Sequence, residues 1–290
     1  MNNNMDLHAP VFLEAQEKLF RKFMEGRLRN GEPLKESVLA QEFGVNRRAM
    51  REALCQAVGW GIVEYVSFCG FRIRDFTLGD LLDLEELRDG CESVAARKLA
   101  QTGSAEAIAR LEHIISEAER AADAGDHVRF ASLDMAFHLE LLRSSGNDKF
   151  RSPAILCYVL VLLKICGSSF ALRNYQSAFH LCKNIDGAGN SPETMLPWSE
   201  KRGCEEHGAI FQAIRDGNAA EAERLAHAHV GVQLKMLGRM TELFGRGARL
   251  SEFSGTGKRE SRKQSSVFSY LDTAAPIMID SEFPNHQNED

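Results

Sequence analysis

The stretch LAQEFGVNRRAMREAL, residues 39–54, decides the fold of the first part of the chain. Gly44 can adopt a positive φ and so turn the chain sharply between two short helices. Asn46 is a good N-cap for the second helix, which we expect over residues 47–58. The apolar residues with the spacing needed to pack the two helices together are Leu39, Val45, Met50 and Leu54. The stretch therefore predicts a helix–turn–helix.

Three arginines, Arg47, Arg48 and Arg51, gather in the first half of the second helix. In helix–turn–helix proteins this end of the helix enters the major groove, where arginine binds phosphates or the O6 and N7 atoms of guanine. The alternative is a small helical hairpin whose arginines simply face solvent. The sequence on either side of the stretch decides between the two.

A β-ribbon follows the helix–turn–helix, because two short strands are indicated at 63–66 and 71–74 with Cys69-Gly70 between them. A helix–turn–helix followed by such a ribbon is typical of DNA-binding proteins. The first helix of the helix–turn–helix is expected over 34–43, and one further helix is expected upstream, over 12–26. Residues 11–76 therefore predict a winged helix-turn-helix that binds double-stranded DNA.

Composition and charge set the frame for the rest of the chain. The 290 residues are 44% hydrophobic and 26% charged, which excludes wholesale disorder. The net charge is -6, but residues 1–75 hold 11 Lys+Arg against 10 Asp+Glu, so the acidic excess lies in the remainder. Seven cysteines without a CxxC pair indicate reduced thiols. With no signal peptide and no apolar run of about 20 residues, we expect a cytoplasmic protein with no membrane partner.

The body of the chain, residues 78–247, has an almost continuous helical pattern and predicts an antiparallel all-α bundle. Residues 148–170 are apolar on nearly all faces, as the central helix of a bundle would be. Residues 174–203 lack periodicity, so we expect an insertion or a mobile loop there. Residues 250–290 predict a disordered tail. The fold class expected for the whole chain is mainly α.

One aspartate and three histidines form a second group of candidate site residues. Asp134 and His138 are spaced i, i+4, so they project from one face of a helix and can share a metal ion. His207 and His229 lie on inward apolar stripes of two later helices. A lone inward histidine is usually a satisfied core residue, whereas three with an aspartate favour a divalent transition metal. Spacing alone leaves a core-histidine cluster and a metal site equally open.

The helix–turn–helix resembles that of the GntR family of bacterial repressors. Asn46 stands where the family usually has Ser, which keeps a cap, and Arg48 stands where it has Thr, which adds a charge. The resemblance implies that Arg47 and Arg51 contact DNA and that Gly70 lies at the tip of a wing that reaches the minor groove. The residues that carry the match are Leu34, Glu36, Leu39-Ala40, Gly44-Val45, Arg47 and Arg51-Glu52-Ala53-Leu54.

The helical region is similar to the FCD effector domain of FadR-type GntR proteins over residues 78–240. In metal-containing members an aspartate and three histidines bind a divalent ion, which implies that Asp134, His138, His207 and His229 hold Zn, Ni or Mn. The interval between His138 and His207 is longer than usual. The matching segments are Arg88-(x3)-Glu92, Asp126-(x7)-Asp134-x-x-Phe137-His138, Ser145-Gly146-Asn147 and Glu206-His207-(x3)-Phe211, leading to His229.

An inward cation at Arg88 suits an anionic effector, although a structural pair with Glu92 at i, i+4 is an equally good interpretation.

The sequence thus predicts a ligand-responsive transcriptional regulator, a repressor released by a small carboxylate effector. We expect it to bind a palindromic operator as a homodimer. The alternatives are a metal-dependent enzyme that uses the Asp/His₃ site and a metal-free regulator. No clear general base accompanies the ligands, which argues against the enzyme.

Overall fold

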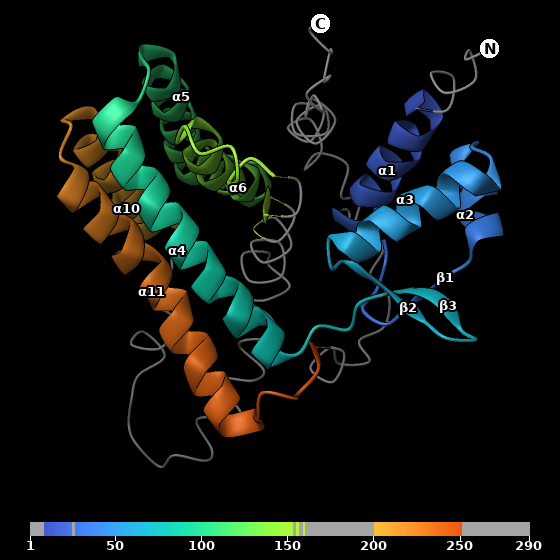
Figure 1. The fold of residues 1–290 in the computed structure, drawn as a ribbon. Helices are drawn as coiled ribbons and strands as arrows, with labels where there is room; N and C mark the ends of the chain where they lie inside the picture. The colour runs from blue at the N-terminus through green and yellow to red at the C-terminus, as the bar shows by residue number, and fades with distance from the viewer. Residues whose placement is uncertain (1–8, 25–26, 153–154, 157–158, 160–199, 251–290) are drawn as a thin grey trace, which may run out of the picture. The chain divides into compact units, whose positions relative to one another are not determined.

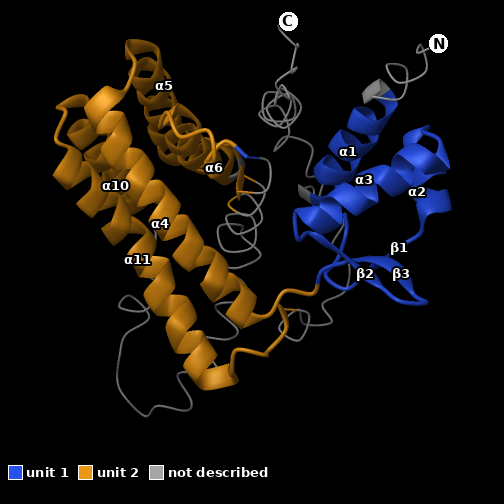
Figure 2. Ribbon diagram, in the orientation of Figure 1, with its two compact units in different colours: residues 1–74, 152–154, 262–290 blue, residues 75–151, 155–261 orange. Residues whose placement is uncertain are grey.

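The computed structural model describes the chain except for residues 1–8, 25–26, 153–154, 157–158, 160–199 and 251–290 (Figure 1). The chain divides into two compact units (Figure 2). Unit 1 is built mainly from residues 1–74, and unit 2 from 75–151 and 155–261. The expected disordered tail and most of the expected 174–203 loop and 148–170 helix lie outside the described residues.

The described part of unit 1 contains three helices and a small sheet. The helices are α1 (Ala9–Met24), α2 (Glu36–Phe43) and α3 (Arg47–Gly59), and the strands are β1 (Pro33–Leu34), β2 (Val63–Val66) and β3 (Gly70–Ile73). The sheet is antiparallel with the order β1-β3-β2. The expected winged helix-turn-helix is present, but the helix predicted from residue 34 starts at Glu36. Leu34 instead pairs with Phe71 of β3, which adds a third strand to the expected two-stranded ribbon.

The turn between α2 and α3 forms as the sequence predicts. Gly44 has a φ of 70°, in the left-handed region that glycine tolerates best. The side chain of Asn46 accepts a hydrogen bond from the backbone N–H of Ala49 at 2.8 Å and so caps α3. Behind the turn, Met50 and Leu54 are fully buried and hold α3 in the core of unit 1.

Unit 2 is an all-α bundle whose helix starts are set by polar caps. Its described helices are α4 (Leu78–Thr102), α5 (Ala105–Asp123), α6 (His127–Ser144), α10 (Glu200–Arg215) and α11 (Ala219–Phe244). Thr77, Ser104, Asp126 and Asn218 each accept a hydrogen bond from a backbone N–H in the first turn of the helix that follows. The loop predicted up to residue 203 ends earlier, because α10 already begins at Glu200.

Helices α4 and α11 run antiparallel and side by side along their length (Figure 1). Their junction is closed by backbone hydrogen bonds, from Leu78 N–H to the carbonyl of Ala248 at 2.9 Å and from Gly79 N–H to that of Arg246 at 2.8 Å. Helices α5 and α6 pack against each other, and α10 contacts both α11 and α5. Among the described residues, no helix combines the length and the apolar character that crossing a bilayer requires.

The cap at the start of α3 yields a stability prediction. Replacing Asn46 by Ala removes the acceptor for the Ala49 N–H and is expected to lower the free energy of unfolding of unit 1 by about 1 kcal/mol. Asn46→Ser keeps a capping oxygen and serves as the control. Urea denaturation followed by circular dichroism measures both variants. Equal unfolding midpoints for Asn46→Ala and the unmodified protein would contradict the role of the cap.

Candidate DNA-binding surface and metal centre

The arginines of α3 are exposed at the start of the helix. The side chains of Arg47, Arg48 and Arg51 are 73%, 76% and 58% accessible. Arg51 Nη1 donates to Glu36 Oε1 at 2.8 Å, and Arg48 Nε donates to Glu52 Oε1 at 2.9 Å. Exposed pairs of this kind contribute little to stability, about 0–1 kcal/mol, so a phosphate or a base can replace the carboxylate at low cost. The structure therefore leaves all three guanidinium groups accessible to a ligand.

Glu36 of α2 pre-orients two of these arginines. It contacts Arg51 at 2.8 Å and Arg47 at 3.9 Å, and its own side chain is only 19% exposed. One carboxylate thus holds two guanidinium groups on the same side of the helix–turn–helix. The sequence pattern contained Glu36 but gave it no such role.

The β2–β3 hairpin, called the wing below, places Gly70 differently from the sequence expectation. Gly70 is the first residue of β3 and pairs with Val66. The chain reverses before it, and the N–H of Cys69 donates to the carbonyl of Val66 at 3.0 Å. The tip of the wing is therefore Ser67, Phe68 and Cys69, with Gly70 beside it. Phe68 is fully exposed there, and the sequence gave no signal for it.

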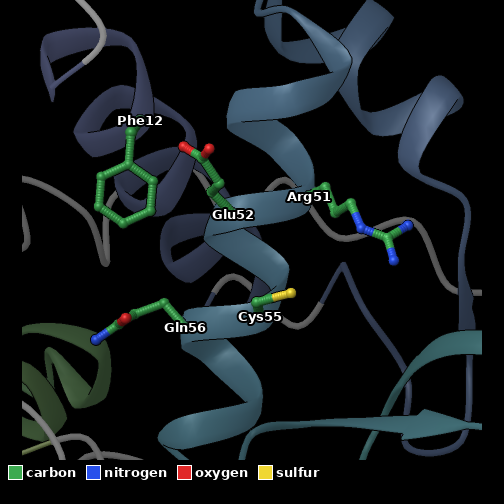
Figure 3. Close-up of a pocket in the computed structure, with 5 residues that line it drawn as sticks. All are labelled: Phe12, Arg51, Glu52, Cys55 and Gln56. Atoms are coloured by element: carbon green, nitrogen blue, oxygen red, sulfur yellow. The ribbon is translucent and has the colours of Figure 1, made fainter. Parts of the chain in front are cut away.

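A shallow hollow on unit 1 lies along α3 and α1. Figure 3 shows Phe12 of α1 facing Glu52 and Gln56 of α3, while Arg51 and Cys55 point to the other side of the helix. All five residues line the hollow, Phe12 from α1 and the other four from α3, so Arg51 borders it as well.

In unit 2 the three predicted histidines come together from three helices. His138 of α6, His207 of α10 and His229 of α11 are buried, and each offers one ring nitrogen within 4.8 Å of the others. The Nε2 atoms of His207 and His229 are 3.3 Å apart. Nitrogens bound to one ion at about 2.0–2.1 Å are roughly 3.0–3.4 Å apart, so this separation fits shared coordination.

Asp134, the fourth predicted ligand, lies beside the histidine group but is not among the residues whose ligand atoms are all within 4.8 Å of one another. Its Oδ1 lies 3.7 Å from Nε2 of His207, on the same side of α6 as His138. This oxygen is buried and has no hydrogen-bond partner among the described residues. An unpartnered buried carboxylate oxygen is costly, and a cation would relieve that cost. The three imidazoles therefore fit a divalent metal, with the carboxylate of Asp134 close by.

Two glutamates orient the histidines for such an ion. Nδ1 of His138 lies 2.8 Å from Glu92 Oε2, and Nδ1 of His229 lies 2.7 Å from Glu206 Oε2. Each carboxylate accepts the Nδ1–H proton, which leaves Nε2 of the same ring as a lone-pair donor. The sequence placed both glutamates in matching segments but did not connect them to the histidines. These two contacts could be identified only once the packing between the helices was known.

Burial keeps the histidines in the form that binds metal. It lowers the pKa of His207 well below its usual value, and the neighbouring His229 and His138 lower it further. Burial also lowers the pKa of His138, partly offset by the attraction of Glu92. Neutral imidazole is the metal-binding form, so these rings need not lose a proton near neutral pH.

Arg88 lies at the centre of the same region and is completely buried. The expected pair with Glu92 is present, with Nε donating to Oε1 at 2.8 Å. Nη1 donates to Glu85 at 3.0 Å and to Gln233 at 3.3 Å, and Nη2 lies 3.1 Å from Nε2 of His138. All arms of the guanidinium are therefore engaged within the protein. The same Nε2 lone pair of His138 is the one that a metal would use.

The two glutamates beside Arg88 differ in protonation. Burial raises the pKa of Glu85 to about 7, although Arg88 opposes the shift, and its Oε2 has no partner among the described residues. Burial also disfavours ionisation of Glu92, but Arg88 and His138 outweigh it and lower that pKa to about 2. Glu92 is therefore the ionised partner of Arg88. Glu85 is a residue that the sequence did not single out.

Both units match known domains. Residues 13–73 match the bacterial regulatory proteins of the gntR family, and residues 83–232 match the FCD domain. The regulator LutR of Bacillus subtilis is 29% identical, with 71% of this chain and 91% of LutR covered. The galactonate operon transcriptional repressor of Escherichia coli is 24% identical, covering 71% of this chain and 89% of its own.

Among solved structures, Escherichia coli McbR/YncC has the same fold, with a TM-score of 0.57 at 17% identity over 79% of this chain and 98% of that one. The winged helix-turn-helix, the all-α bundle and the two matched domains agree with one another. The relatives with names are transcriptional regulators, and so the family gives no support to an enzyme that uses the Asp/His₃ site. The chain belongs to the GntR family of bacterial DNA-binding transcriptional regulators, in the group with an FCD domain.

Proposed function

We propose that this regulator is a homodimeric repressor that binds a palindromic operator and releases it when a small carboxylate metabolite binds. The carboxylate is held by a divalent ion, Zn, Ni or Mn, on Asp134, His138, His207 and His229. The observation that carries the proposal is the buried group of three imidazoles with an unpartnered carboxylate oxygen in the FCD domain. The relative that represses a galactonate operon, a gene set named for a sugar acid, supports the ligand class.

We infer that operator contact is made by the start of α3 and by the wing. Arg47, Arg48 and Arg51 contact phosphates and base edges in the major groove. Asn46 caps the helix with its side-chain oxygen and has its amide nitrogen left to donate. Gly70 lets the backbone of the wing approach the minor groove closely. One head offers few contacts, so two heads on a palindrome are needed for useful affinity.

The effector site follows from the coordination chemistry. Four protein ligands leave two positions in an octahedral ion, which suits a carboxylate and a neighbouring oxygen of one small acid. Arg88 was expected to meet this carboxylate directly. In the structure its donors are engaged, so a ligand oxygen reaches Arg88 by replacing Gln233 or Glu85 on Nη1, or by meeting Nη2 once a metal has taken Nε2 of His138. We therefore propose the ion as the primary contact and Arg88 as a secondary one.

A metal-free regulator is the second candidate, and one contact favours it. Nη2 of Arg88 lies 3.1 Å from Nε2 of His138, so this histidine is satisfied by the protein alone. Oδ1 of Asp134 has no hydrogen-bond partner among the described residues, and for that reason we prefer the metal-bound form. Direct measurement of the metal decides between the two candidates.

The first test concerns the arginines. Arg47→Ala and Arg51→Ala are each expected to lose about 1–3 kcal/mol of operator affinity, because each removes a base or phosphate contact. Arg224→Ala, an exposed arginine of α11 paired with Glu221, is the matched control and should bind normally. Gel-shift titration on an operator selected from random duplexes measures all three. Unchanged affinity in both α3 variants would contradict the proposed docking.

The second test concerns the metal itself. The purified regulator is expected to carry about one divalent ion per chain, and His207→Ala should lose it together with the response to carboxylates. Operator binding without effector should persist in this variant, because it resides in unit 1. His127→Ala, an exposed histidine of α6, is the control. Mass spectrometry of native protein counts the ions. A metal-free unmodified protein would leave the metal-free regulator as the surviving candidate.

The third test separates orientation from ligation. Glu206 does not belong to the proposed ligand set, yet it fixes His229 through Nδ1. Glu206→Gln is expected to weaken metal binding by about 10–100-fold, as is usual for such supporting carboxylates. Competition against a chromophoric chelator measures the affinity, and Glu205→Gln on the exposed side of α10 is the control. Equal affinities for the two variants would show that Glu206 does not support the site.

A further inference from the structure

The wing tip carries an aromatic residue in a backbone conformation that aromatic residues avoid. Phe68 has a φ of 64°, the only positive φ of a non-glycine residue in the part of the chain that the structure describes. It is the third residue of the turn from Val66 to Cys69, a position where a positive φ usually selects glycine or asparagine. The left-handed conformation is unfavourable for a residue with a large side chain. Phe68 therefore strains the turn that it occupies.

Burial of the ring does not offset this strain. Phe68 is 107% exposed, the most exposed of the large hydrophobic residues in the described part of the chain. A single exposed hydrophobic residue is ordinary by itself. An exposed ring that also strains its backbone is different, because neither burial nor local geometry favours it. Strained residues that the fold does not explain are concentrated at functional sites.

The wing contacts helix α3 through Phe71 of β3. The ring of Phe71 is buried, and the guanidinium of Arg51 lies 6.0 Å from its centroid. The exposed Tyr65 of β2 packs edge-on against the same ring, with centroids 5.1 Å apart. The wing and the α3 arginines are thus parts of one surface within unit 1. A duplex that contacts Arg51 also lies within reach of the wing.

The charges around the tip suit a polyanion. Residues 65–71 contain no charged side chain, and the nearest acidic residue, Glu64, is paired with Arg72 at 2.7 Å. No carboxylate of the tip therefore repels phosphate. An exposed apolar side chain that reaches the minor groove can enter between two base pairs, and such wedges kink the duplex. A ring on a tight, uncharged hairpin has the shape and chemistry of this kind of wedge.

We propose that Phe68 enters the minor groove beside each half-site, partly unstacks one base step and bends the operator. The inference rests on the proposed docking of α3. It adds a contact that selects operator sequences by how easily the DNA bends at the step under the wing. Pyrimidine–purine steps such as TA and CA unstack most easily, so they are expected under the wing. Selection at this position would then arise without a hydrogen bond to a base edge.

The test uses the full-length protein and the operator that it selects from random duplexes. Phe68→Gly removes the ring and also relieves the positive φ, so the variant is expected to unfold at the same temperature as the unmodified protein or a higher one. Cys69→Ser changes the neighbouring tip residue and is the matched control. Bending is measured by circular-permutation gel shift. Unstacking is measured with 2-aminopurine placed at the candidate step.

The unmodified protein and Cys69→Ser are expected to bend the operator by about 20–90° and to raise 2-aminopurine fluorescence. Phe68→Gly should leave the duplex nearly straight and the fluorescence low. Replacing the TA or CA step by a stiff A-tract should weaken binding of the unmodified protein about tenfold and hardly affect Phe68→Gly. Equal bending and equal step preference in both proteins would overturn the wedge.

Two further outcomes separate this inference from its basis. If Arg47→Ala and Arg51→Ala both bind the operator with unchanged affinity, the docking of α3 is wrong, whatever Phe68 does. If Phe68→Gly binds and bends DNA normally but shifts the monomer–dimer equilibrium in sedimentation, Phe68 is a contact between copies of the chain and the wedge is overturned. The proposal stands only if Phe68→Gly loses bending while its oligomeric state is unchanged.

Discussion

The helical unit depends on the burial of one guanidinium group. Removing Arg88 from water costs several kcal/mol unless every donor is paired, so its partners must be in place when the bundle closes. Glu92, one turn away on α4, supplies a local partner. The remaining donors reach Gln233 on α11 and His138 on α6, and so the same group connects three helices. Glu92 then uses its second oxygen to orient His138. The geometry of the candidate metal centre follows from how Arg88 is satisfied.

The charges in this core are unbalanced without a further cation. Glu92 and Asp134 face one guanidinium, and the raised pKa of Glu85 already removes part of a third negative charge. His138 and His207, whose pKa values are lowered, add none near neutral pH. A divalent ion at the histidines would give the group a small positive charge, and one carboxylate from a ligand would cancel it. The same balance explains why an anionic ligand suits the site even though Arg88 has no free donor.

Sequence predicted the elements whose local signals are strong. Gly44 predicted the turn and Asn46 predicted the cap of the following helix. Helical spacing placed the four candidate ligands on inward faces, so they could be named from the sequence. The sequence could not reveal β1, because the two residues Pro33 and Leu34 are a strand only through their pairing with β3.

Glu85, Glu206 and Phe68 were missed for related reasons. Glu206 acquires its role from a contact between helices that no spacing rule specifies. Glu85 stands at i, i+3 from Arg88, a spacing that allows the pair, but its raised pKa depends on burial within the bundle. An exposed Phe68 is recognisable only once its backbone angle is known. The residues that sequence reasoning missed are therefore those whose roles depend on backbone conformation or on tertiary contacts. The roles of the residues that it found follow from their positions along one helix.

Helix α4 connects the DNA-binding unit in the sequence to the region of the candidate metal centre. Only residues 74–77 separate β3 of the wing from the start of α4. Arg88 lies ten residues further on, about 15 Å along the axis at the rise of an α-helix. The first turn of α4 is held to the end of α11 by backbone hydrogen bonds at Leu78 and Gly79. A ligand that takes an acceptor from Arg88 changes the partners of both α4 and α11, because Gln233 lies on α11. Regulation requires that the two states of this helix pair differ in free energy with and without ligand, and under the proposed function a change of partner at Arg88 would contribute to that difference.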